Sequence, residues 1–148
     1  MAYLSIWIHM VWSTKNREPL INSVALRQKI FTHIAENAGK KGIELDCIDG
    51  GYDHAHALIS LGADQTIAKI AQLLKGESSH WVNEQGLLQH KFEWQDDYFA
   101  VSVSETALRN VRGYIKNQEE HHRKKTFAVE FERFVNTKSL GGSFPIGG

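Results

Sequence analysis

Residues 43–61, IELDCIDGGYDHAHALISL, hold two short runs of strand-forming residues around the turn sequence DGGYD. Runs over 43–49 and 54–61 have the length of strands, and the glycines and aspartates between them are typical turn residues. The stretch therefore predicts a β-hairpin. Because it lies between two helical patterns, this hairpin decides the fold: it is the centre of a β-α-β-β-α-β chain.

The flanking sequence completes that order. Apolar residues alternate with other residues over 3–14, which predicts a strand, and YFAVSVS at 98–104 predicts a short fourth strand. Helical spacing predicts helices over 23–38 ending at Gly39, over 67 to about 83 with an interruption at Gly76, over 105 to about 123 with Ser104 as N-cap, and over 127–136. The predicted class is α+β: a ferredoxin-like βαββαβ antiparallel sheet with helices on one face, plus C-terminal helices.

Length and composition suit one soluble domain. We expect it to span residues 1–140, with the Gly-rich tail 141–148 disordered. No apolar run approaches the roughly 20 residues that cross a bilayer, so no membrane contact is expected. The single cysteine, Cys47, fits the cytoplasm. Seventeen basic and seventeen acidic residues weigh mildly against a coat on duplex DNA, although a local basic groove stays compatible with that balance.

Two histidines, His54 and His56, lie one residue apart in the predicted third strand. Residues i and i+2 of a strand share a face, so these imidazoles should project side by side while Ala55 and Ala57 face the other way. Such a pair can hold one cation. The plainer alternative is two polar strand residues that face solvent or a neighbouring helix.

A third ligand could come from the third predicted helix, VRGYIKNQEEHH. Tyr114 and Gln118 are four residues apart and share one helical face, which His121 and His122 continue. Two histidines and an amide oxygen suit a hard ion such as Mg²⁺ or Mn²⁺ better than zinc. Such an ion most often polarises phosphate oxygens, and a tyrosine beside it is a candidate nucleophile. The plainer alternatives are a helix tyrosine that packs through its ring and a solvated helix end.

The two motifs together resemble a known family. DHAHALIS is similar to the histidine–hydrophobic–histidine (HUH) motif of the IS200-like single-tyrosine transposases of bacterial insertion sequences, and YIKNQ is similar to their Tyr-x-x-x-Gln helix. The resemblance extends over residues 3–125 through STKNREPLI, LKGESSHWVN and FEWQDDYFAVSVSETALRNVRGYIKNQEEHH. The KNREP and NQEEHHR segments look most like the REP-associated tyrosine transposases.

The resemblance implies an activity and a set of site residues. Tyr114 would form a covalent 5′-phosphotyrosine with single-stranded DNA, and His54, His56 and Gln118 would bind Mg²⁺ or Mn²⁺. The family acts as homodimers that recognise hairpins in single-stranded DNA and cut nearby. Ala55 departs from the larger Val or Leu usual between the histidines. The alternative from another class is a catalytically inactive ferredoxin-like nucleic-acid-binding protein; a replication initiator or relaxase of the HUH type fits this short chain less well.

Candidate DNA contacts come from basic residues on the third helix and in two other segments. A local excess of positive charge is what a surface that follows phosphates needs, even in a chain with no net charge. An ordinary solvated charge is the alternative for each residue. The candidates are Lys15, Arg17, Lys75, Arg109 and Arg112. Trp81 and Trp94 could stack on unpaired bases, although each is more often a core residue.

Overall fold

The elements of the chain follow the predicted order. A computed structural model describes residues 3–117. Its elements are β1 (Trp7–Ser13), the 3₁₀ turn η1 (Lys15–Arg17), α1 (Val24–Lys40), β2 (Glu44–Gly50), β3 (His54–Ser60), α2 (Ile67–Gln85), β4 (Phe99–Val103), the 3₁₀ turn η2 (Glu105–Ala107) and α3 (Leu108–Lys116). The β-α-β-β-α-β order expected from the hairpin is confirmed.

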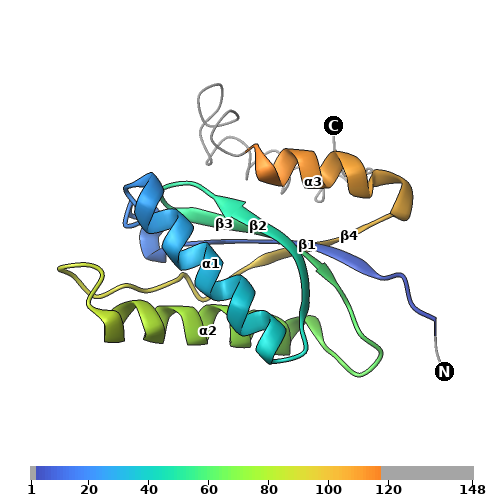
Figure 1. Cartoon of the computed structure of the whole chain (residues 1–148), viewed down its shortest axis with the longest axis horizontal. Helices are drawn as coiled ribbons and strands as arrows, with labels where there is room; N and C mark the ends of the chain where they lie inside the picture. Colours follow the sequence, from blue (N-terminus) through green and yellow to red (C-terminus); the bar gives the residue numbers. More distant parts are fainter. Residues whose placement is uncertain (1–2, 118–148) are drawn as a thin grey trace.

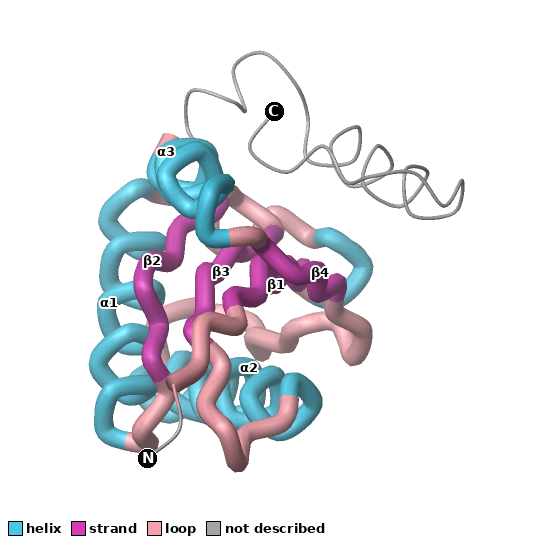
Figure 2. Tube along the Cα trace, turned by 90° about the vertical axis from the view of Figure 1, so that its right-hand side faces the viewer, coloured by secondary structure: helices cyan, strands magenta, loops and turns pink. Residues whose placement is uncertain are grey.

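The strands form one antiparallel sheet between two layers of helix. The strand order is β2-β3-β1-β4, and each neighbouring pair is antiparallel. Helices α1 and α2 cover one face, and α3 lies across the other (Figures 1 and 2). The predicted α+β class with a ferredoxin-like sheet is confirmed. The structure adds that the helix after β4 covers the face that α1 and α2 leave open.

The main apolar core lies between the sheet and the pair α1 and α2. Alternate residues of the two central strands point into it, as the pleat of a strand requires. Ile30 and Ile34 of α1 pack there with Ile70 and Leu74 of α2. The buried sheet residues are Met10, Trp12, Ala55, Ala57 and Ile59. Because Ala55 and Ala57 are small, the helices can pack close to the middle of β3.

A second, smaller apolar cluster holds α3 on the opposite face. Val111 and Ile115, four residues apart on one side of the helix, pack on Leu58 and Val103 of the sheet. Charge adds to the contact at the β2 edge, where the guanidinium of Arg112 pairs with the carboxylate of Asp46 through two nitrogens.

The helices differ from the predictions at three positions: the end at Gly39, the interruption at Gly76 and the N-cap Ser104. Ser23 caps α1 by accepting from the amide of Leu26 at 3.1 Å. That helix continues through Gly39 to Lys40, and α2 continues through Gly76, because packing on the sheet outweighs the low helix propensity of one glycine. Ser104 precedes the 3₁₀ turn η2 rather than α3, so α3 begins only at Leu108.

Several predictions fall outside residues 3–117. They are the end of the third helix with Gln118, His121 and His122, the helix over 127–136 and the tail 141–148. Of the helices that the structure does describe, none combines the length and the apolar character needed to span a membrane. The predicted single domain over residues 1–140 stays a prediction.

Candidate active site

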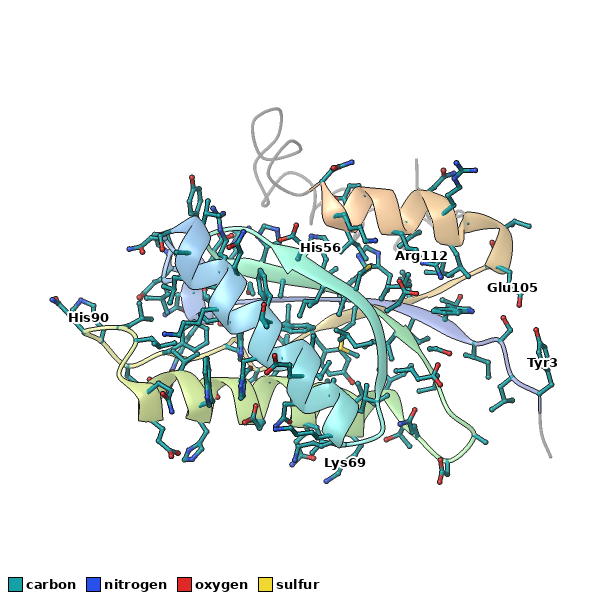
Figure 3. The ribbon with its side chains drawn as sticks, viewed as in Figure 1. Tyr3, His56, Lys69, His90, Glu105 and Arg112 are labelled. Carbon is teal, nitrogen blue, oxygen red and sulfur yellow. The ribbon has the colours of Figure 1, made fainter. Side chains whose placement is uncertain are left out.

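The histidine pair lies on the central strand β3, on the face that α3 covers. His54 and His56 are fully buried, with exposed fractions of 0% and 1%. Their ring centroids are 5.1 Å apart, and Ala55 and Ala57 point to the opposite core. The side-by-side arrangement predicted from strand alternation is therefore confirmed. Of the plainer alternative, the part in which both histidines face solvent is wrong, whereas the part in which they face a neighbouring helix holds for His56, whose ring contacts Tyr114 of α3 (Figure 3).

The turn before the pair fixes its backbone and orients the first imidazole. Gly50 ends β2, and a Cβ there would lie 2.1 Å from the carbonyl oxygen of His54, so no other residue fits without a shift. Asp53, the last residue of the turn, places Oδ1 2.9 Å from Nδ1 of His54. A carboxylate hydrogen-bonded to one ring nitrogen fixes the orientation of the imidazole, so the other ring nitrogen faces away from the carboxylate, as in many metal sites.

A third histidine, His9 of β1, completes the buried cluster. Its Nε2 lies 2.9 Å from Nδ1 of His56, and the two rings stack with centroids 5.2 Å apart. Burial lowers the pKa of His9 to about 4, so the imidazole is neutral at neutral pH. Sequence reasoning placed His9 in the first strand but assigned it no role. The sequence showed only which face of the first strand His9 shares with its alternate neighbours. It did not show which residue of β3 lies beside His9, because that depends on the register of the two strands.

Tyr114 of α3 brings the second predicted motif to the first. Its ring stands edge-on to that of His56 with centroids 5.6 Å apart, and to that of His9 at 6.3 Å. The tyrosine is partly exposed and packs at the edge of the α3 cluster. His56 and Tyr114, which are 58 residues apart in sequence, therefore meet in one place, as the hypothesis of a joint site requires.

The donors present are compatible with a metal ion but do not complete a site. Within residues 3–117, no three side chains of the His, Cys, Asp and Glu types are grouped so that they could bind one metal. Each of the paired histidines uses Nδ1 toward Asp53 or His9, so Nε2 is the atom through which either ring would bind a metal ion. The predicted third ligand, Gln118, lies just beyond the described residues. The two imidazoles therefore fit the role of two ligands of a divalent ion.

Two of the predicted DNA contacts line a groove beside α2. Lys15 and Lys75 border a groove of about 500 Å³ together with Trp94 and Tyr98. The ammonium of Lys75 donates to the carbonyl oxygens of Asp96 and Asp97 at 2.8 and 3.2 Å, and that of Lys15 lies 3.1 Å from Glu93. Burial lowers the pKa of Lys75.

One wall of the groove is joined through the backbone to the strand that pairs with the histidine strand. Ser13, two residues before Lys15, pairs with His54 across the sheet. The amide of Thr14 donates to the carbonyl oxygen of Asp53 at 2.8 Å. The backbone therefore passes from the end of β1, beside His54, to the groove wall at Lys15, while the groove itself lies on the α2 face, opposite the histidine side chains.

The other predicted contacts lie on α3 and in η1. Arg109 and Arg17 are exposed. Arg112, labelled in Figure 3, forms the ion pair with Asp46. Its guanidinium carbon lies 5.6 Å from the centre of the Trp7 ring. Of the two tryptophans, Trp94 is core, with Nε1 donating to Ser78, and Trp81 stacks on His33.

Known proteins resemble this chain in sequence and in fold. The ISDra2 transposase TnpA of Deinococcus radiodurans is 28% identical over 116 residues, which are 74% of this chain and 81% of the relative. Two solved structures have the same fold. A putative transposase from Deinococcus radiodurans R1 has a TM-score of 0.63 at 22% identity, covering 80% of this chain and 95% of that chain. A REP-associated tyrosine transposase bound to a REP hairpin has a TM-score of 0.57 at 12% identity, covering 84% and 71%. The model of the IS200-like transposase family matches residues 2–118, and the chain therefore belongs to that family.

Proposed function

We propose that this transposase cuts and rejoins single-stranded DNA near hairpins through a covalent phosphotyrosine on Tyr114, with Mg²⁺ or Mn²⁺ as cofactor. The observation that carries the proposal is the position of Tyr114, whose ring lies 5.6 Å from that of His56 in a buried polar site. The ring packs at the edge of the apolar α3 cluster, but that contact accounts for only part of its surroundings. It also borders the histidine cluster and stays partly exposed, so a phosphate could reach it.

The step assigned to Tyr114 is an attack on a DNA phosphodiester. The phenolic oxygen forms a bond to phosphorus, the bond from phosphorus to the 3′ oxygen breaks, and the departing strand takes a proton to become a free 3′ hydroxyl. The phenol loses its proton in the same step. Attack by a 3′ hydroxyl on the phosphotyrosine reverses these bond changes, so rejoining needs no nucleotide cofactor. Because tyrosine ionises near pH 10, the reaction needs electrostatic help at neutral pH.

That help is the role we assign to a bound divalent ion. His54, His56 and Gln118 would hold it, and the ion would neutralise charge on the phosphate oxygens when bound. Asp53 would not touch the ion but orients His54 through the hydrogen bond of 2.9 Å to its Nδ1. Burial by α3 keeps water away from both imidazoles, which strengthens electrostatic interactions within the site.

The groove beside α2, on the other face of the sheet from the histidine side chains, would bind DNA away from the phosphate that is cut. Lys15 links the groove to the strand end next to His54, and Tyr98 offers an exposed ring for base stacking. Arg109, exposed on α3, would contact phosphate from the tyrosine side. The hairpin bound by the REP-associated neighbour supports a hairpin substrate here. We further propose that the chain acts as a homodimer in the cytoplasm, as its family resemblance implies.

The test is covalent capture of DNA. Single-stranded hairpin oligonucleotides with a 5′ or 3′ label are incubated with the full chain and Mg²⁺, Mn²⁺ or EDTA, then separated on a denaturing protein gel. We expect a metal-dependent band of protein joined to the fragment that lies 3′ of the cut. Tyr114→Phe keeps the ring and its packing but lacks the attacking oxygen, so this variant should bind the hairpin with unchanged affinity and form no adduct.

Each outcome bears on a different part of the proposal. An adduct that persists in Tyr114→Phe would refute the nucleophile, with Tyr98→Phe as the matched control for another partly exposed tyrosine. Equal cleavage with EDTA would refute the cofactor. Hairpin binding by the wild-type chain with no adduct under any condition would instead support the inactive binding protein.

A further inference from the structure

We propose that His9 is a positioning residue for His56: its Nε2 accepts the Nδ1–H of His56 and so holds His56 in the tautomer whose Nε2 lone pair can bind the metal. The inference rests on the proposed function, because it assigns His9 a purpose within that metal site. It concerns an imidazole on a different strand, 47 residues earlier in the chain.

The geometry of the contact is that of a hydrogen bond within a rigid sheet. The two nitrogens are 2.9 Å apart, and both side chains are at least 98% buried. The strands that carry them are directly paired, with Val11 opposite His56 and Leu58 opposite His9. Each imidazole therefore reaches diagonally across one rung of the ladder, and neither backbone can shift without breaking the pairing of β1 with β3.

Proton accounting selects one direction for this bond. A neutral imidazole carries one proton, so one ring must donate and the other accept. If His56 binds a cation through Nε2, its proton must be on Nδ1, the atom that faces His9. His9 must then accept at Nε2 and carry its own proton on Nδ1. The opposite direction would place the proton of His56 on Nε2 and block metal binding.

A parallel arrangement at the neighbouring histidine supports this assignment. Nδ1 of His54 lies 2.9 Å from a carboxylate oxygen of Asp53, which can only accept when it is ionised. Each imidazole of the pair thus has an oriented acceptor on its Nδ1 side. An imidazole in place of a second carboxylate adds no negative charge to a site that must also accept DNA phosphate.

The first measurement is the tautomer of His56 in the metal-free full chain, read from nitrogen–proton correlations of ¹⁵N-labelled histidine rings. The His56 signals are assigned by their loss in His56→Ala. We expect the Nδ1–H form in the wild type. His9→Leu removes the acceptor at similar volume and should yield a mixture or the Nε2–H form, whereas His9→Gln offers an amide oxygen and should restore Nδ1–H.

The second measurement is Mn²⁺ affinity by calorimetry and electron paramagnetic resonance. Loss of an outer partner of a metal ligand typically weakens metal binding by about 10–100-fold, which is the loss we expect in His9→Leu. The Mn²⁺ affinity of His9→Gln should lie within about threefold of that of the wild type. His80→Gln, at an exposed histidine on α2 paired with Glu84, controls for ions bound at the surface.

The outcomes separate the role of His9 from the proposed function. An Nε2–H tautomer of His56 in the wild type, or unchanged tautomer and Mn²⁺ affinity in a folded His9→Leu, overturns the positioning role. If His9→Leu does not fold, the tautomer of His56 in the wild type and in His9→Gln still tests the positioning role. Mn²⁺ binding by the wild type that is insensitive to His54→Ala and His56→Ala counts instead against the metal site of the proposed function.

Discussion

The two faces of the sheet use the same strands for opposite purposes. On β3, Ala55 and Ala57 face α1 and α2, while His54 and His56 face α3. Both faces are buried, yet the first is closed by apolar packing and the second by hydrogen bonds and ring contacts among histidines. Along this one seven-residue strand, alternate side chains therefore belong either to the apolar core or to the candidate active site.

This difference shows how the fold supports a polar site without losing its core. A buried imidazole that lacks hydrogen-bond partners is costly, so the α3 face supplies Asp53 and His9 as partners. The α1 and α2 face carries most of the large buried apolar side chains, and α3 adds only a small cluster. Changes on one face should therefore mainly affect activity, and changes on the other should mainly affect folding.

The largest expected effect comes from His56→Ala. Removing this imidazole should reduce metal-dependent DNA cleavage more than about 100-fold, beyond the usual loss for an outer partner of a ligand. The apolar core on the other face is untouched, so the circular dichroism spectrum and hairpin affinity in EDTA should stay close to those of the wild type. Cleavage is measured as the initial rate across a Mn²⁺ titration. An unchanged titration curve would show that His56, on the α3 face, does not contribute to metal-dependent cleavage.

The reverse pattern is expected for Ile34→Ala on α1. Ile34 is 1% exposed within the core cluster, so truncation should lower the free energy of unfolding by about 2–5 kcal/mol. Urea denaturation measures this loss. At a temperature where the variant stays folded, its cleavage rate should match that of the wild type. A lower rate in the folded variant would mean that the core face also shapes the site.

The smallest effect concerns Cys47, a half-buried residue of β2 that packs with the α3 cluster. Burial, followed by the charge of Asp46, raises the pKa of its thiol to about 11. A raised pKa lowers the thiolate fraction, so iodoacetamide should react at pH 8 at least about tenfold more slowly than with the urea-unfolded chain. The midpoint of the rate against pH should also lie higher in the folded chain. Equal midpoints would indicate that this face is open to solvent near Cys47.

Much of the architecture was predictable because its signals are local. Alternation over His54–Ser60, the turn residues before it and the spacing of Val111 with Ile115 each depend on neighbours within a few residues. The errors at Gly39, Gly76 and Ser104 are also local, since residue propensity alone does not weigh the packing that extends or delays a helix.

The candidate site divides in the same way. The pairing of His54 with His56, and Tyr114 as the candidate nucleophile, follow from motif spacing and family resemblance. For Arg112, sequence offered a free cation for DNA, but the fold places Asp46 within 2.9 Å of it. No pattern in the sequence of α3 indicates that contact, because its partner is 66 residues away.

By itself, then, the sequence determined which residues share a face of each element, since strand and helix periods are properties of the local backbone. Only the tertiary structure decided which faces meet. The register of β1 against β3 puts His9 beside His56, and the docking of α3 puts Tyr114 beside both. Register and docking are set by burial summed over the whole sheet, a quantity that no short stretch of sequence contains.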